Sequence, residues 1–263
     1  MRFDSLSEQF IPDHVFVYIV TGSVVCYDGK KSQVLSQGES YLFRKNRLIR
    51  YYPDKTGEAL AFVRICIEEP FLKEFQQKHQ VSLPKFDSSD SYLKLDVNEL
   101  LSDFIRSLKL IYHQGEIDEA FEVVKQEELL IILLLNQPGL ASILFDYGKP
   151  EKINIEAFMH RHYKFNVSVD QFAYLTGRSL SAFKRDFKTV FNETPGRWLV
   201  QKRLQEAYFL LSEENKKPSA IYLELGFETL SHFSFAFKKQ FGLTPTELID
   251  QRWQHIGNYQ TVN

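Results

Sequence analysis

The sequence predicts an α+β protein of two domains: a small β-domain with a helical hairpin in residues 1–147, and an all-helical domain in residues 148–263. Short runs of β-branched and aromatic residues alternate with turn signals between about residues 15 and 68, which is typical of strands. Helical periodicity begins at Val97. In the last third of the chain, a pattern of aromatic and turn residues recurs after 50 residues. A chain of 263 residues is long enough for two domains.

The front segment is expected to form a small sandwich or barrel, because short strands follow one another at intervals of about 8–12 residues. Asp28-Gly29 is a hairpin signal, and Gly38 and Pro53-Asp54 mark further turns. The expected strands are Val15–Val20, Val24–Tyr27, Tyr41–Phe43, Ile49–Tyr52 and Leu60–Ile67.

Two helices are expected between about residues 97 and 136. The first carries apolar residues at helical spacing up to Ile111, and the second begins at the capping residue Asp118 and ends before Pro138. The short segment His113–Gly115 between them favours an antiparallel hairpin. The second helix is apolar on more than one face near its end. Two interpretations stay open: both helices pack on the sheet, or part of their surface joins two copies of the chain.

A linker is predicted at Phe145–Pro150, and two copies of one unit follow it. Each copy has a short helix, a glycine break, a longer helix with aromatic residues at i, i+4 and i+8, and then Thr-Pro at the start of another helix. This is the helix-turn-helix pattern. The copies lie at about 168–191 and 219–241, joined by one continuous helix at 195–211, and Ser168 and Ser179 are good N-cap residues. The residues expected to form the core of these motifs are Phe183, Phe187, Phe191, Gly226, Phe227, Phe233, Phe237 and Phe241.

The opposite face of each longer helix is polar and basic. In the first copy the outer residues recur at i, i+3, i+4 and i+7, so they share one face that is free to enter a DNA major groove. Arg and Lys there donate to guanine edges or to phosphates. The candidate DNA contacts are Ser181, Lys184, Arg185 and Lys188 in the first copy, and Ser231, His232, Ser234, Lys238 and Lys239 in the second. A rigid linking helix would hold the two about 34 Å apart, one DNA turn.

The net charge of −2 is the sum of two unlike parts. Residues 1–151 carry 17 basic and 23 acidic residues, a net of −6, while residues 152–263 carry 15 basic and 11 acidic residues, a net of +4. Such asymmetry hints at a nucleic-acid partner for the basic part. The basic outer faces of the two repeated helices give that hint a location.

Other chemistry finds little support in the sequence. Cys26 and Cys66 are too few for a disulfide framework or a four-cysteine zinc site and are expected to be buried free thiols. His160 and His162 stand at i and i+2, which do not face each other on a helix. No nucleophile elbow or phosphate loop is present. We expect no catalytic residue, no metal and no cofactor, and the absence of a signal peptide or a membrane-length apolar run predicts a cytoplasmic protein.

The stretch from about Asn154 to Arg252 resembles the DNA-binding domain of the AraC/XylS-type bacterial transcription regulators. The matching residues of the second copy are Ile221, Gly226-Phe227, Ser231, Phe233-Ser234, Phe237-Lys238-Lys239, Phe241-Gly242 and Thr244-Pro245. The first copy matches in Ala173, Ser179, Phe183, Arg185, Phe187-Lys188 and Pro195, and the linking helix in Arg203-Leu204, Ala207 and Leu210-Leu211. Two departures stand out: Phe235 replaces a usually basic residue of the second outer face, and Tyr222 replaces a usual Ala.

The resemblance implies a sequence-specific DNA-binding transcription regulator whose front half is a cupin-like sensor arm. Residues 15–70 contain no histidine, which disfavours the metal chemistry of cupin enzymes. The implied partners are double-stranded DNA, a second copy through residues about 97–136, an unidentified small-molecule or protein effector and RNA polymerase, but no membrane. Two alternatives remain: a non-metal cupin-like enzyme, and a DNA-repair protein that carries the same DNA-binding module.

Overall fold

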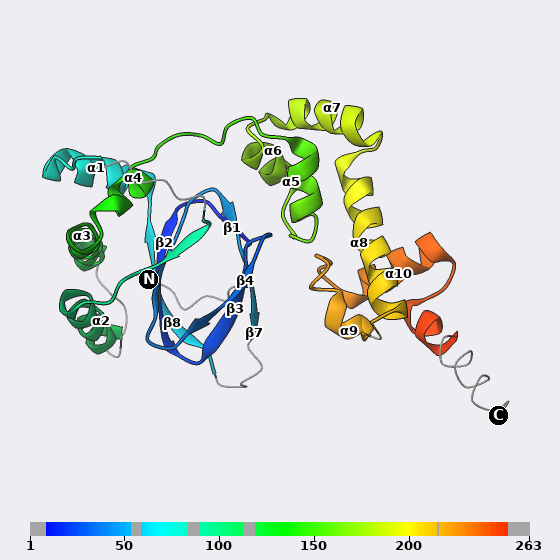
Figure 1. The fold of residues 1–263 in the computed structure, drawn as a ribbon, viewed down its shortest axis with the longest axis horizontal. Coiled ribbons are helices and arrows are strands. Elements are labelled where there is room, and N and C mark those ends of the chain that lie inside the picture. The colour runs from blue at the N-terminus through cyan, green and yellow to red at the C-terminus, as the bar shows by residue number, and fades with distance from the viewer. Residues whose placement is uncertain (1–8, 54–58, 84–89, 113–118, 215, 252–263) are drawn as a thin grey trace. The chain divides into compact units, whose positions relative to one another are not determined.

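The computed structural model describes residues 9–53, 59–83, 90–112, 119–214 and 216–251 (Figure 1). The chain divides into unit 1, Met1–Lys149, and unit 2, Pro150–Asn263. This division lies two residues from the boundary expected at 147/148.

The described residues of unit 1 form three antiparallel sheets. One has four strands in the order β8-β2-β5-β9, one has three in the order β4-β3-β7, and β1 pairs with β6. The strands are β1 Phe10–Ile11, β2 His14–Thr21, β3 Ser23–Tyr27, β4 Ser32–Ser36, β5 Ser40–Phe43, β6 Arg47–Leu48, β7 Arg50–Pro53, β8 Ala61–Ile67 and β9 Tyr92–Lys94.

Strand β2 shows why the four-stranded sheet lies in the middle of unit 1. Successive side chains of a strand point to opposite faces. Val15, Val17 and Ile19 therefore join the core shared with strands β3 and β4, while Phe16 joins the core shared with the helices. A strand buried on both faces reads as a continuous apolar run, as this segment does.

The helices of unit 1 cover the second face of that sheet. They are α1 Glu69–His79, α2 Glu99–Tyr112, α3 Glu119–Asn136, the 3₁₀ turn η1 Pro138–Leu140 and α4 Ala141–Leu144. The two predicted helices are α2 and α3, which pack on each other, and the Lys125 ammonium of α3 donates to the Ser107 hydroxyl of α2 at 2.9 Å. The connecting residues 113–118, including the expected cap Asp118, lie outside the described residues.

Several elements were not expected from the sequence. Helix α1 buries only Leu72 and Phe75 of its eleven residues, so its apolar signal is short, although Pro70 marks a helix start. Strand β9 has three residues and owes its place to pairing with β5. The hairpin signal at Asp28 is confirmed: its carboxylate accepts the backbone N–H groups of Lys30 and Lys31 between β3 and β4.

The expected β-sheet structure of the front segment is confirmed, but its closure into a small barrel is not. Across the described ranges, the strand pairings give separate sheets of four, three and two strands, and no pairing joins them into one closed barrel. The fold is β-sheet layers with helices on one side, followed by a helical unit. No helix in the described ranges is by itself long and apolar enough to span a membrane. The helical segments Ala120–Asn136 and Pro138–Leu144 reach that length and composition only when they are taken together, and the pair is bent by 119°.

Unit 2 is entirely helical over the part that the structure describes. Its helices are α5 Ile155–His162, α6 Val169–Leu175, α7 Leu180–Phe191, α8 Pro195–Ser212, α9 Pro218–Ile221 and α10 Leu230–Phe241, and the chain is helical again from Pro245. The expected linking helix at 195–211 is α8. At about 1.5 Å per residue, its 18 residues span roughly 27 Å.

Candidate nucleic-acid interface

The first helix-turn-helix motif consists of α6 and α7, and both helices begin at the predicted N-caps. The Ser168 hydroxyl accepts the Gln171 N–H at 3.1 Å, and the Gln171 side chain accepts the Ser168 N–H in return, which is a full capping box. Ser179 caps α7 by accepting the Ala182 N–H. Each cap pairs a backbone N–H that the helix leaves free, so the turn between the helices is tightly defined.

A stripe of phenylalanines fastens α7 to the rest of unit 2. Phe183 and Phe187 are fully buried, and Phe191 is half-buried. The ring centroids of Phe187 and Phe191 lie 4.3 Å apart, and Phe191 contacts the indole of Trp198 in α8 at 4.5 Å. The i, i+4, i+8 pattern therefore forms the buried face, as predicted, and it turns the remaining face of α7 outward.

The outer face of α7 carries all four candidate DNA contacts of the first copy. Ser181, Lys184, Arg185 and Lys188 are exposed. The Arg185 side chain is 76% exposed, and its guanidinium contacts the Asp186 carboxylate at 3.3 Å. An exposed pair of this kind contributes little stability, so the guanidinium is readily available to a new acceptor.

Arg178, which the sequence analysis did not single out, stabilises the turn of the first motif. Its guanidinium donates to the Asp186 carboxylate at 3.1 Å and to the carbonyl oxygens of Ile153 and Thr176. The hydrogen bond from Arg178 holds the pKa of Asp186 below its usual range. The turn residue Gly177 has φ +67°, and a Cβ there would lie 2.4 Å from the Glu151 carbonyl carbon, so only glycine fits.

The second motif repeats this plan with a shorter first helix. Helix α9 has four residues and continues into turns up to Gly226. Helix α10 is 12 residues long, the same length as α7. Phe233 and Phe237 are fully buried, Phe227 packs on Phe233 at 5.2 Å, and Phe241 lies half-buried against Tyr208 at 5.0 Å. All the predicted core residues of both copies therefore lie on inner faces.

Of the five candidate DNA contacts on α10, four are exposed as expected and one is not. Ser231, His232, Lys238 and Lys239 are exposed, and the His232 ring also packs edge-on against Phe227 at 5.7 Å. Ser234 is half-buried, because it stands three residues before Phe237 and so borders the buried stripe. Phe235 is 71% exposed, a large apolar side chain standing among polar neighbours.

Arg203, an almost fully buried arginine of unit 2, was missed as a functional candidate. It lies on the apolar face of α8, where Leu199, Leu204 and Ala207 are also buried, and it is 8% exposed. A charged residue within the apolar stripe of a helix is the signal that could have found it, because such a group needs a full set of partners.

The groups considered for other chemistry are not assembled into a site. The His162 ring contacts the Phe158 carbonyl, and His160 packs edge-on against Trp198 and Phe191. In the described ranges, no three His, Cys, Asp or Glu side chains are placed to hold a metal ion. Both cysteines are free thiols. Cys26 is buried as expected, and burial raises its pKa. Cys66, which was also expected to be buried, is only half-buried, because it lies on β8, an edge strand of the four-stranded sheet.

Comparison with known proteins assigns both units. A family model described as the ExsA N-terminal regulatory domain matches residues 14–143, and a helix-turn-helix domain model matches residues 172–251. The chain belongs to the AraC family of transcription regulators. Members of this family are DNA-binding regulators, and this AraC-family chain combines their helix-turn-helix domain with an N-terminal regulatory domain.

Individual relatives cover most of the chain. The thermoregulatory protein LcrF of Yersinia pestis is 26% identical over 198 residues, 73% of each chain. The transcriptional regulator ExsA of Pseudomonas aeruginosa is 25% identical over 238 residues, 88% of this chain and 84% of ExsA. Apo ToxT of Vibrio cholerae, a solved structure, shares 15% identity over 93% of this chain and 91% of its own, with a TM-score of 0.44.

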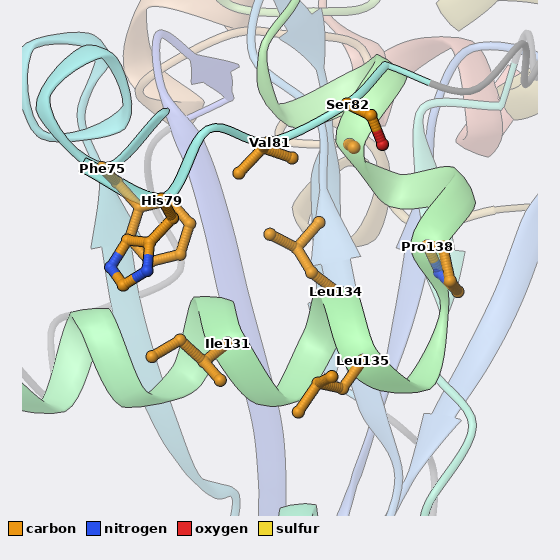
Figure 2. Close-up of a pocket in the computed structure, with 9 residues that line it drawn as sticks. Phe75, His79, Val81, Ser82, Ile131, Leu134, Leu135 and Pro138 are labelled. Atoms are coloured by element: carbon orange, nitrogen blue, oxygen red, sulfur yellow. The ribbon is translucent and has the colours of Figure 1, made fainter. Parts of the chain in front are cut away.

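The regulatory domain of this AraC-family chain contains an apolar groove of about 360 Å³ (Figure 2). Helix α1 contributes Phe75 and His79, helix α3 contributes Ile131, Leu134 and Leu135, and Val81, Ser82, Pro138 and Ala141 complete the lining. This volume is within the range of small-molecule sites. The Phe75 ring also stacks on the Phe145 ring, with a centroid distance of 6.2 Å and an interplanar angle of 12°. Phe145 stands directly before the segment that leads to unit 2.

Proposed function

We propose that this AraC-family regulator binds a specific DNA sequence by placing α7 and α10 in adjacent major-groove segments. The observation that supports this most strongly is the repeated helix with a buried phenylalanine stripe and an exposed polar stripe. Lys184, Arg185 and Lys188 of α7 would contact base edges and phosphates, and Lys238 and Lys239 of α10 would contact phosphates. We further propose that the chain is a non-catalytic regulator acting in the cytoplasm, where bacterial DNA lies.

The test is loss of operator affinity. Binding-site mapping across the genome of the source bacterium identifies the operator, and Lys184→Ala with Arg185→Ala is expected to weaken specific binding by about 1–3 kcal/mol for each base-reading side chain removed. The matched control is Lys73→Ala with Lys78→Ala, which removes two exposed charges from α1 in unit 1. Wild-type affinity of the α7 double variant, measured by footprinting, would show that α7 does not read bases.

A second copy is proposed to pair through α3. Phe121, Val124, Ile131 and Leu135 are all exposed, up to 69% for Leu135, and together with Glu128 they recur at intervals of three and four residues. This is the spacing of a helix–helix seam. Exposed apolar side chains gathered on one helix face mark interaction sites. The DNA-binding face would then be doubled in the dimer.

Charge in the seam tests the dimer. Phe121→Glu with Val124→Glu in the full chain is expected to give a monomer by light scattering at tens of micromolar, because two buried charges on each side would face each other, and neither side chain lines the groove of unit 1. The control is Val34→Glu, at another exposed apolar position, in β4. If the α3 double variant stays dimeric, the interface lies elsewhere; if the wild type is a monomer, α3 does not pair two copies.

The groove of unit 1 is proposed as the place where an effector acts. It lies within the matched regulatory domain, and its lining residue Phe75 stacks on Phe145, which lies beside the interdomain segment. Leu134→Trp would fill the groove, and we expect it to abolish the response of an operator-driven reporter while the purified protein keeps its operator affinity. An intact response would exclude the groove. Dialysis of the cell extract distinguishes the two kinds of effector. If the dialysed extract still triggers the reporter response, the effector is a protein; if the response is lost, the effector is a small molecule.

A further inference from the structure

Arg203 connects three segments of unit 2 through its guanidinium. From α8, its Nε donates to the carbonyl oxygen of Tyr163 at 2.7 Å, and one terminal nitrogen donates to that of Phe165 at 2.7 Å. The other terminal nitrogen donates to the carbonyl oxygen of Gly226 at 2.8 Å. Tyr163 and Phe165 follow α5, and Gly226 is the turn glycine of the second helix-turn-helix motif. One side chain therefore joins α5, α8 and the second motif.

The second turn is built closely around this guanidinium. Gly226 has φ +83°, and a Cβ there would lie 2.6 Å from the Lys164 carbonyl oxygen and 2.9 Å from the Arg203 Cζ. The backbone of the turn thus contacts both the end of α5 and the arginine directly. Nearby, the Lys164 ammonium donates to the Glu206 carboxylate at 2.7 Å, which adds a second link between α5 and α8.

The other end of α5 contacts the turn of the first motif. Arg178 of that turn donates to the Ile153 carbonyl before α5, and the Cβ position of Gly177 would overlap the backbone of Glu151. The segment 151–165 therefore contacts one helix-turn-helix turn at its start and reaches the other at its end through Arg203. Together with α8, it forms a closed frame that links the two motifs.

Arginine is the residue type that this junction requires. Its planar guanidinium presents five N–H donors in a fixed geometry. Three carbonyl groups from two segments can therefore accept from it at the same time only in one relative arrangement. A lysine has a single nitrogen and does not reach all three sites. A buried cation is costly unless its hydrogen bonds are complete, so the junction tolerates little displacement of the carbonyls it joins.

We propose that Arg203 is a positioning residue that sets the distance and rotation between the two helix-turn-helix motifs, and thereby the spacing of the two DNA segments that the protein accepts. This rests on the proposed function, in which α7 and α10 read adjacent segments of one operator. Arg203 touches no DNA itself; it acts by holding the second turn in place relative to α5 and the first motif.

The experiment measures operator affinity as a function of spacing, with the full chain. The probes are the operator, versions with one or two base pairs inserted or deleted between its two segments, and each segment alone. The variants are Arg203→Met, which keeps the stem but removes the donors, and Arg203→Lys, which keeps the charge and is the milder change should the Met variant fail to fold. The control is Arg197→Met in the same helix, where the arginine side chain is 72% exposed.

For wild type and Arg197→Met, we expect each inserted base pair to lower affinity at least tenfold. For the Arg203 variants, we expect about tenfold weaker binding to the native operator, unchanged binding to each single segment, and a spacing dependence that falls below threefold. A folded variant that keeps the sharp wild-type dependence would overturn the proposal, as would a uniform loss on every probe, which marks a general stability defect. If the wild type binds one segment as tightly as the whole operator, the two-segment function itself fails.

Discussion

The two helix-turn-helix motifs differ on their outer faces much more than on their inner ones. Along α7 and α10, phenylalanine occupies the same buried places, and a hydroxyl side chain caps each helix. The outer positions have diverged: Arg185 corresponds to Phe235, and Lys184 to Ser234. Packing against the rest of unit 2 constrains the residues of the inner face in both copies. The residues of the outer face are constrained only by the partner that they bind.

The distribution of charge along the two helices also differs. In α7, the basic residues begin at Lys184, near the middle of the helix, whereas in α10 they occur only at Lys238 and Lys239 in its last turn. Recognition helices contact base edges mainly through their N-terminal part. We therefore expect α7 to read bases through charged donors, and α10 to contribute phosphate contacts and an apolar contact through Phe235.

The largest expected effect tests the shared inner face. Phe187→Ala and Phe237→Ala each remove a fully buried ring and should lower the free energy of unfolding of unit 2 by about 3–5 kcal/mol. Denaturant unfolding followed by the fluorescence of Trp198, which contacts Phe187, measures the first, and circular dichroism measures both. A much smaller loss for Phe237→Ala would mean that the second copy packs more loosely than the first.

The next effect concerns base preference. Exchanging the outer residues by Arg185→Phe and Phe235→Arg should change selection at one base pair of each segment, by about 1–3 kcal/mol per base pair, because arginine favours guanine and phenylalanine cannot donate. Selection from randomised operators gives the preference of each variant. If Phe235→Arg leaves the preference of the second segment unchanged, Phe235 does not face the bases.

A smaller effect isolates the apolar contact of Phe235. If its exposed ring packs on a thymine methyl group, replacing that thymine by uracil should cost about 0.8 kcal/mol, the value of one buried methylene-sized group. The same replacement should have no effect on the Phe235→Ala variant, which serves as the control. Equal losses for both proteins, measured by competition binding, would place the methyl contact with another residue.

The smallest effect concerns salt. Lys188→Ala and Lys238→Ala, which occupy the same place in the two copies, should each reduce the slope of log affinity against log salt by about 1 if each ammonium neutralises one phosphate. Both should leave the base preference as it is. A change in slope for one copy alone would show that only this helix lies close to the DNA backbone.

Local pattern was enough to predict most of unit 2. Its helices could be placed from residues close together in the chain: Ser168 and Ser179 as caps, Pro195 at the start of α8, and phenylalanines at helical spacing. The matched family models support the same division into a regulatory and a DNA-binding part. The prediction succeeded because helices are stabilised by local contacts and because two copies repeat one signal.

Other features depend on partners far along the chain. Strand β9 exists because β5 lies beside it, and the expected barrel is a set of separate sheets because closure depends on pairings between distant strands. Arg203 shows the same limit at the level of one side chain, since its three acceptors lie 40, 38 and 23 residues away. The amino-acid pattern alone established the repeated unit and its basic faces. Only the tertiary structure decided how the two copies are held together, because that depends on contacts between residues that no local pattern connects.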